Sequence, residues 1–173
     1  MIPGPFAEFI DDGLGEVIDR GNGRYDVVFH RRISRPVEKV WAALTVPERI
    51  ADWFTEADLE LRIGGRYRLR FSDAEDSGFD GQIVELDPPR RIAHTWPHPE
   101  HTQSIVRYEL EPDSDGGCRL TLTQTSLASR HSGVLAGWHT FLEALPGAAE
   151  QVRMTWRAER EAEIRALYPR SLR

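Results

Sequence analysis

Residues 37–54 read VEKVWAALTVPERIADWF, and this stretch decides how the rest of the chain is organised. Apolar residues in its first half recur at the spacing of three and four residues that marks one face of a helix. Pro47 then restarts the pattern, because proline is well tolerated in a first helical turn. The stretch therefore predicts two short helices in tandem, one over about 36–45 and one from Pro47 to the aromatic pair Trp53-Phe54.

Alternating patterns lie on both sides of these helices. Before them, residues 25–33 alternate between apolar and polar side chains, which is the period of a half-buried strand. The leader before that strand, residues 1–23, is rich in Pro and Gly, and we expect it to be only partly ordered, with an edge strand at 15–19. After the helices, residues 58–125 return to a period of two with five turn-like breaks. They predict five or six antiparallel strands joined as a meander.

The strand period also assigns side chains to the two faces of the sheet. Tyr67 and Leu69 point to one face, while Arg66 and Arg68 point to the other. Tyr108 falls on an apolar face by the same parity. One face is therefore apolar and the other charged, and we expect the arginines to be solvated opposite acidic residues of neighbouring strands.

Helical spacing returns after the last strand. Apolar residues from Val134 to Leu145 form one stripe, and Pro146-Gly147 is expected to interrupt the helix. A second, charged helical stretch follows and runs to Tyr168. Its apolar residues are Val152, Trp156, Ile164 and Leu167.

Together these elements predict an α+β fold. The economical arrangement is a strongly curved antiparallel sheet of six to seven strands around a long C-terminal helix, with two short helices after the first long strand. Because a curved sheet diverges from a straight helix, a cavity is expected between them. We divide the chain into the leader 1–23, a ligand-binding domain over 24–146 and a C-terminal helical extension over 147–173.

The composition excludes several classes of protein. The 173 residues hold no apolar run long enough to cross a membrane, and the start of the chain lacks a signal-peptide pattern, so the expected location is the cytoplasm. The single cysteine, Cys118, excludes an internal disulfide framework and a multi-cysteine zinc site. A formal charge of −6 argues against a nucleic-acid partner. No pattern implies a cofactor.

Several segments, taken in order, resemble one known family. They match the bacterial proteins similar to the activator of heat-shock protein 90 ATPase, in the SRPBCC superfamily, over about residues 14–145. The resemblance implies the START-like helix-grip fold. It implies no single activity, because that fold serves lipid carriers, hormone receptors, polyketide cyclases and co-chaperones. The matching segments are 37–54, Gly64-Gly65-Arg66-Tyr67, ELDPPR at 85–90, Thr95-Trp96, Glu109-Leu110-Glu111-Pro112, Leu120-Thr121-Leu122-Thr123 and Gly137-Trp138-His139.

The candidate ligand-binding residues are aromatic side chains and a few polar groups expected on the inner side of the sheet and helix. Such a lining suits a lipophilic ligand that carries one or two oxygens. Each of these residues is also compatible with plain core packing. They are Trp53, Phe54, Tyr67, His94, Trp96, Tyr108, Gln124, His131, Trp138 and Phe141.

Histidines suggest two further roles. His94 and His131 are weak candidates for a general acid and base, because imidazole titrates near neutral pH, although no carboxylate partner is predicted on their face. His94, His98 and His101 have a spacing that invites a metal, but Pro97 and Pro99 lie between them and no cysteine helps. We therefore expect no metal site.

Three functions stay open at this point. The first is binding of a hydrophobic small molecule, such as a lipid, a polyketide or an aromatic metabolite, in the expected cavity. The second is a polyketide cyclase or dehydratase-like enzyme that uses a cavity acid or base. The third, regulation of a chaperone ATPase, is ranked last, because the chain does not show the separate N-terminal chaperone-binding domain of the eukaryotic activators. The extension either packs back on its own sheet or mediates a homodimer, because Val152, Trp156, Ile164 and Leu167 need a surface to bury against.

Overall fold

The computed structural model describes residues 13–71, 78–99, 103–129 and 132–169. One antiparallel sheet of eight strands is built from them, in the order β1-β2-β8-β7-β6-β5-β4-β3. The strands are β1 (Glu16–Asp19), β2 (Tyr25–Ile33), β3 (Glu56–Leu59), β4 (Arg66–Arg70), β5 (Gly78–Asp87), β6 (Arg91–Thr95), β7 (Ile105–Pro112) and β8 (Cys118–Leu127). Only β2 and β8 are neighbours that are distant in sequence, so β3 to β8 form the predicted meander.

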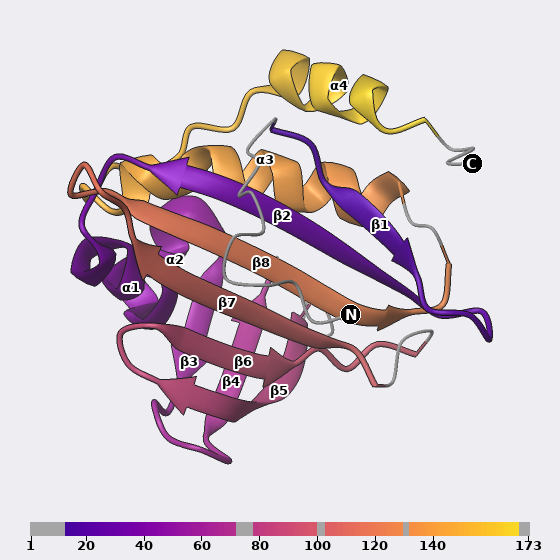
Figure 1. Ribbon diagram of the computed structural model, residues 1–173, viewed down its shortest axis with the longest axis horizontal. Helices are drawn as coiled ribbons and strands as arrows, with labels where there is room; N and C mark the ends of the chain where they lie inside the picture. Colours follow the sequence, from indigo (N-terminus) through magenta and orange to yellow (C-terminus); the bar gives the residue numbers. More distant parts are fainter. Residues whose placement is uncertain (1–12, 72–77, 100–102, 130–131, 170–173) are drawn as a thin grey trace.

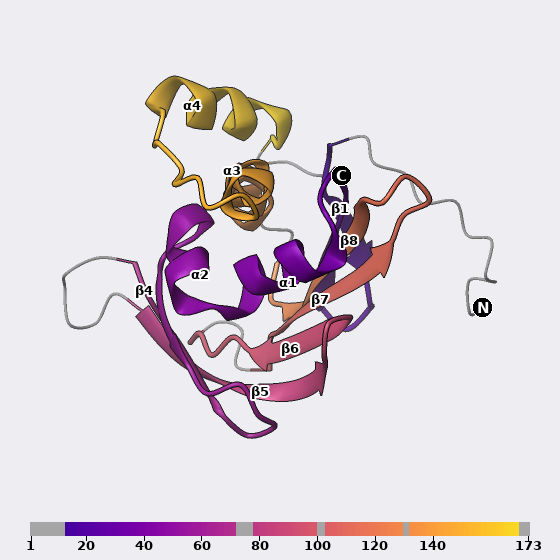
Figure 2. The same ribbon diagram turned by 90° about the vertical axis from the view of Figure 1, so that its left-hand side faces the viewer.

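Four helices accompany the sheet. They are α1 (Val37–Thr45), α2 (Pro47–Trp53), α3 (Ser132–Ala148) and α4 (Ala158–Leu167). Figure 2 shows α1 and α2 inside the curve of the sheet, α3 lying across the opening, and α4 on the side of α3 that faces away from the sheet. The predicted α+β architecture, with two short helices after the first long strand and a long helix near the C-terminus, is confirmed.

The strand count is eight, one above the upper predicted number, because β1 is a full member of the sheet. It pairs with β2 from Glu16↔Val28 to Asp19↔Tyr25. The tight turn between them uses positive φ angles at Gly21, Asn22 and Gly23, conformations that glycine and asparagine adopt most readily. The last part of the predicted leader therefore forms one edge of the sheet.

The end of the chain differs from the prediction in two ways. Pro146 does not interrupt α3, which continues to Ala148. Val152 and Trp156 do not share a helix with Ile164, because the linker over 149–157 is not helical and α4 begins at Ala158. Both side chains are largely exposed, whereas Ile164 is fully buried. The linker leaves the helical path because its backbone bonds elsewhere, with the Met154 N–H donating to the Asp52 carbonyl at 2.7 Å.

The extension packs back on the rest of the chain, with α4 alongside α3 (Figure 1). Tyr168, just after α4, is buried and joins three elements through its hydroxyl. That hydroxyl accepts a hydrogen bond from the Gly15 N–H at 2.9 Å and lies 2.7 Å from His139 Nδ1 on α3. The extension therefore packs on α3 and not on the sheet as the first alternative expected, and the homodimer stays a prediction.

The two faces of the sheet follow the predicted parity. Tyr67, Leu69 and Tyr108 are buried on the concave side. On the convex side, Arg66 pairs with Asp58 at 2.9 Å, and Arg68 pairs with Asp80. The charged face is thus a ladder of ion pairs at the surface, as expected for cross-strand neighbours of opposite charge.

Candidate functional site

The concave side holds a dense group of aromatic rings around Trp138 of α3. The Trp138 ring stacks on Phe54 at a centroid distance of 5.3 Å and meets Trp96 edge to face at 5.5 Å. Its indole N–H donates to Gln124 Oε1 at 2.7 Å, and Gln124 Nε2 donates to Ser104 Oγ at 3.1 Å. Aromatic side chains therefore lie directly against Trp138, and the buried Gln124 amide is hydrogen-bonded at both ends. The cavity expected from the sequence stays a prediction.

Deeper in the concave face, three polar rings lie together. His94 of β6 stacks on Tyr67 of β4 with centroids 3.8 Å apart and planes 7° apart. Tyr108 of β7 lies 6.3 Å from the His94 ring, and Phe79 of β5 lies nearly parallel to it at 6.2 Å. Tyr67, His94 and Tyr108, here called the inner cluster, are all almost completely buried.

The inner cluster contains two buried polar atoms that lack a hydrogen-bond partner among the residues that the structure describes. They are Nε2 of His94 and the hydroxyl oxygen of Tyr108. A buried polar atom without a partner costs about 1–3 kcal/mol, so native structures rarely leave one without a reason. These two atoms are therefore the hydrogen-bonding groups of the cluster that the described residues leave unsatisfied.

The hydrogen bond at His94 Nδ1 determines whether a partner of Nε2 must donate or accept a hydrogen bond. His94 Nδ1 lies 3.0 Å from the Thr95 carbonyl oxygen, which only accepts, so Nδ1 carries the proton and the neutral ring leaves Nε2 as an acceptor. Burial lowers the pKa of His94 to about 4, so the ring stays neutral at pH 7. Tyr108 brings an O–H donor, and burial raises its pKa well above the ordinary value. A hydroxyl group offers both kinds of hydrogen bond, because it donates and accepts.

A series of rings connects the inner cluster with the surface. Phe71, at the end of β4, is 44% exposed and lies 6.4 Å from the Phe79 ring. Phe79 and Trp96 are half-buried and 4.1 Å apart, and both lie within 6.2 Å of His94. Half-buried Phe141 of α3 meets Phe54 at 4.6 Å on the same side. An apolar ligand would meet an aromatic surface along the whole way from solvent to His94.

Nine of the ten predicted ligand-binding residues come together on this concave side. His131 lies outside the described residues, so its pairing with His94 stays a prediction. Within the described residues, neither ring nitrogen of His94 is bonded to an acidic side chain, because Nδ1 lies against the Thr95 carbonyl and Nε2 has no partner. His98 is exposed and His101 also lies outside the described residues, and within the described ranges no group of three potential metal ligands occurs.

Sequence reasoning did not select Phe79, Phe71 or Ser104 for the site. Phe79 is directly opposite Leu69 in the pairing of β4 with β5, so strand parity extended across that hairpin could have found it. Ser104 precedes β7 and has no such signal. Its role depends on the buried Gln124 side chain, which comes from a different strand.

Comparisons with known proteins show which family the chain belongs to. The family model described as "Activator of Hsp90 ATPase homolog 1-like protein" matches residues 34–150. The chain belongs to this family. It lies within the SRPBCC superfamily, as the sequence resemblance indicated. A comparison with curated proteins gave no match.

Solved structures of three relatives share the fold of this family member. CalU16 from Micromonospora echinospora is 26% identical with a TM-score of 0.67, over 84% of this chain and 86% of CalU16. DynU16, described as a protein in the dynemicin biosynthetic locus, is 26% identical with a TM-score of 0.64, over 76% of this chain and 51% of DynU16. EF2215 from Enterococcus faecalis is 18% identical with a TM-score of 0.73, over 89% of this chain and 87% of EF2215, and supports the fold alone.

The described helices include none that is long and apolar enough to cross a membrane.

Proposed function

We propose that this protein binds a hydrophobic small molecule on the concave side of its sheet, and that the ligand carries a hydroxyl group. The observation that carries the proposal is the pair of partnerless atoms in the inner cluster, His94 Nε2 and the Tyr108 hydroxyl, within the described residues. They are an acceptor and a donor on neighbouring strands, and both lie among aromatic rings.

The aromatic surroundings define the rest of the ligand. Phe79 and Trp96 lie between exposed Phe71 and the inner cluster, so the body of the ligand would contact rings. No charged side chain is buried at these rings in the described part of the chain. A neutral aromatic or polyketide-like molecule fits this lining better than an ion, because a buried charge without a partner is costly. The biosynthetic locus of DynU16 supports a small-molecule ligand in the family.

Entry requires some movement of side chains. Trp138, Phe54 and Trp96 are in close contact, so a ligand larger than a single ring must shift the half-buried rings. Phe79, Trp96 and Phe141 are half-buried and are the expected moving parts. Trp138 is anchored by its hydrogen bond to Gln124 and is expected to stay in place.

The first experiment is native mass spectrometry of the purified protein, compared with the mass of the denatured chain. A co-purified organic compound that is released on denaturation and contains a hydroxyl group on an apolar body would support the proposal. A charged or fully polar compound bound at the inner cluster would contradict it.

A direct titration tests the two polar atoms. 2-Naphthol serves as the probe and naphthalene as its counterpart without the hydroxyl, with binding followed by calorimetry on the wild type and on Tyr108→Phe. We expect tighter binding of 2-naphthol, by about tenfold for one or two buried hydrogen bonds, and loss of most of that advantage in Tyr108→Phe. Tyr25→Phe, a half-buried tyrosine on β2 of the same sheet, is the matched control. Equal affinity for both probes would contradict a polar role for the inner cluster.

A cyclase or dehydratase reaction would use the same inner cluster, with His94 as its acid or base. Burial lowers the pKa of His94 to about 4, which makes it a weak base at pH 7, so this pKa favours binding over proton transfer. Conversion of a bound compound that is abolished by His94→Phe would move the assignment to an enzyme.

A further inference from the structure

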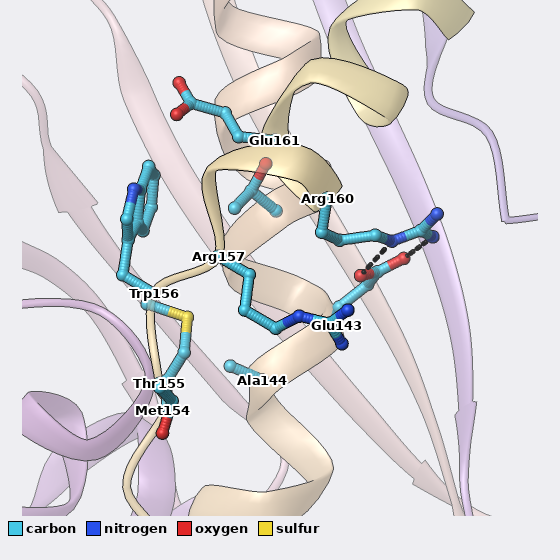
Figure 3. A pocket seen from close by; sticks show the side chains of 9 residues that line it. Glu143, Ala144, Met154, Thr155, Trp156, Arg157, Arg160 and Glu161 are labelled. Carbon is cyan, nitrogen blue, oxygen red and sulfur yellow. Dashed lines mark hydrogen bonds and ion pairs between the residues drawn. The ribbon is translucent and has the colours of Figure 1, made fainter.

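A pocket lies outside the concave face, between α3, the linker over 149–157 and α4. Its volume is about 240 Å³. Figure 3 shows the linker and the first turn of α4 on one side and α3 on the other. It is lined by Thr140, Glu143, Ala144, Met154, Thr155, Trp156, Arg157, Arg160 and Glu161.

Both walls of this pocket are held in place. On the linker side, the Met154 N–H donates to the Asp52 carbonyl of α2 at 2.7 Å. On the α4 side, Arg160 binds Glu143 of α3 with two nitrogens, one of them at 3.0 Å, and Ile164 is buried behind it. The pocket is therefore formed before any ligand arrives, which reduces the cost of binding.

Among the charged side chains that line the pocket, Arg157 is the one without an ion-pair partner in the described part of the chain. The carboxylate of Glu143 is occupied by Arg160, and that of Glu161 accepts from Arg165 at 2.6 and 3.0 Å. Arg157 forms no hydrogen bond or ion pair through its guanidinium with any residue in the described part of the chain. In Figure 3 its side chain extends across the pocket toward α3. The group without a partner among the described residues is thus a positive charge, which favours an anion.

Apolar surface lies beside that charge. Trp156 is 54% exposed although it is the largest side chain of the linker, and the Met154 thioether lies between it and Arg157 in Figure 3. Ala144 of α3 completes this part of the wall. An exposed indole next to an available guanidinium suits a molecule that has both an apolar ring and a negative group, because arginine pairs with carboxylates through two parallel hydrogen bonds.

We propose that this pocket is a second binding site, which takes a small organic acid with an aromatic body. The carboxylate pairs with Arg157, and the ring packs against Trp156 and Met154. The site shares no residue with the concave face and takes a ligand of opposite character, charged where the first is neutral. It also gives the C-terminal extension a role beyond covering α3.

The experiment titrates the full chain with indole-3-acetate and, separately, with the neutral indole-3-ethanol, using ¹H–¹⁵N NMR. The signals to follow are the indole N–H of Trp156 and the Nε–H of Arg157. We expect both to shift with indole-3-acetate, and Arg157→Gln to weaken that binding by about tenfold, the usual effect of removing a charge-assisted hydrogen-bond pair. Arg153→Gln is the matched control, because Arg153 is an exposed arginine of the same linker that does not line the pocket.

Three results of this titration would overturn the proposal. The first is binding of indole-3-ethanol as tight as that of the acid, and the second is an equal effect of Arg157→Gln and Arg153→Gln. The third is a set of shifts confined to His94, Tyr108 and their neighbours. A concentration-dependent dimer in sedimentation that dissociates in Trp156→Ala, without binding of the acid, would also overturn it and assign this surface to a second copy of the chain. Tyr108→Phe should leave the binding of indole-3-acetate unchanged, which separates this site from the concave one.

Discussion

Polar groups on the two faces of the same strands lie in opposite environments. On the convex face, Arg91 and Arg107 both bind Glu85, at 3.0 and 2.8 Å, so that charge is matched across neighbouring strands. On the concave face of those strands, His94 and Tyr108 each keep a buried polar atom without a partner among the described residues. Successive side chains of a strand point to opposite faces, so the two environments lie one residue apart in the sequence.

This difference indicates where the molecule departs from what stability alone would favour. Surface ion pairs contribute little each, and losing one is tolerated. A buried partnerless atom costs stability and is retained only for a reason, such as a ligand. The predictions below test the comparison between the two faces, beginning with the largest effect.

Trp138→Ala should cause the largest loss of stability. It removes a buried ring that contacts Phe54 and Trp96 and leaves the Gln124 amide without its donor. We expect the free energy of unfolding to fall by about 3–5 kcal/mol, measured by urea denaturation. Arg68→Ala, on the convex face, should cost less than about 1 kcal/mol. Comparable losses in the two variants would contradict the contrast between the faces.

His94 should make stability depend on pH. Burial lowers its pKa to about 4 from the ordinary 6.5, so between these pH values the unfolded chain binds a proton that the folded chain does not. Stability therefore falls as the pH is lowered through this range, by about 3 kcal/mol in total from this residue.

The contribution of His94 is measured as a difference, because other groups act in the same direction. The pKa of His139 is also lowered, by burial, and that of Glu143 is lowered by its hydrogen bond to Arg160. Urea denaturation of wild type and His94→Phe at pH 4, 5, 6 and 7 isolates the slope that belongs to His94. Parallel pH profiles for the two proteins would show that the His94 ring is not buried in its neutral form.

Two tyrosines provide a matched pair of smaller effects. Tyr108→Phe removes a buried hydroxyl that has no described partner, so we expect stability to rise, by about 1 kcal/mol. Tyr168→Phe removes a hydroxyl bonded to Gly15 and close to His139, so we expect stability to fall, by about 1–2 kcal/mol. The midpoint of thermal unfolding should move in opposite directions. A loss of stability in Tyr108→Phe would mean that its hydroxyl has a partner in the folded protein.

Glu85→Gln should have the smallest effect. The Glu85 carboxylate is partly exposed, and its hydrogen bonds to Arg107 and Arg91 hold its pKa below the ordinary value despite some burial. We expect a loss of less than about 1 kcal/mol, and salt should reduce it because exposed charges are screened. Denaturation at low and high salt measures this. A loss that salt does not change would show that packing, and not charge, holds this residue.

Much of the fold and part of the site could be predicted from the sequence, for physical reasons that particular residues illustrate. Parity along a strand is strict, so the alternating pattern alone assigns Tyr67 and Tyr108 to the apolar face, and both are buried on the concave side. Side-chain contacts across the concave side cannot be predicted from a local sequence pattern. Trp138 contacts Phe54 and Trp96, which come from other parts of the chain.

The pocket at Arg157 shows the same limit more sharply. Trp156 and Val152 fit a helical spacing with Ile164, and the sequence therefore suggests one apolar stripe. Proline and glycine mark helix ends only statistically, and Pro146 remains inside α3. The linker is held in its actual path by a backbone bond to Asp52, about one hundred residues earlier, which no local pattern reveals.

The hydroxyl of Tyr168 has a consequence for the order in which the protein is made. Its partner Gly15 lies 153 residues earlier. A ribosome releases Gly15 long before Tyr168, and domains fold as their chain emerges. The edge strand β1 and the outer side of α3 therefore wait for the last helix before their contact is complete. In a chain stalled or cut between α3 and α4, β1 could pair with β2, but Gly15 would lack its hydrogen bond to Tyr168.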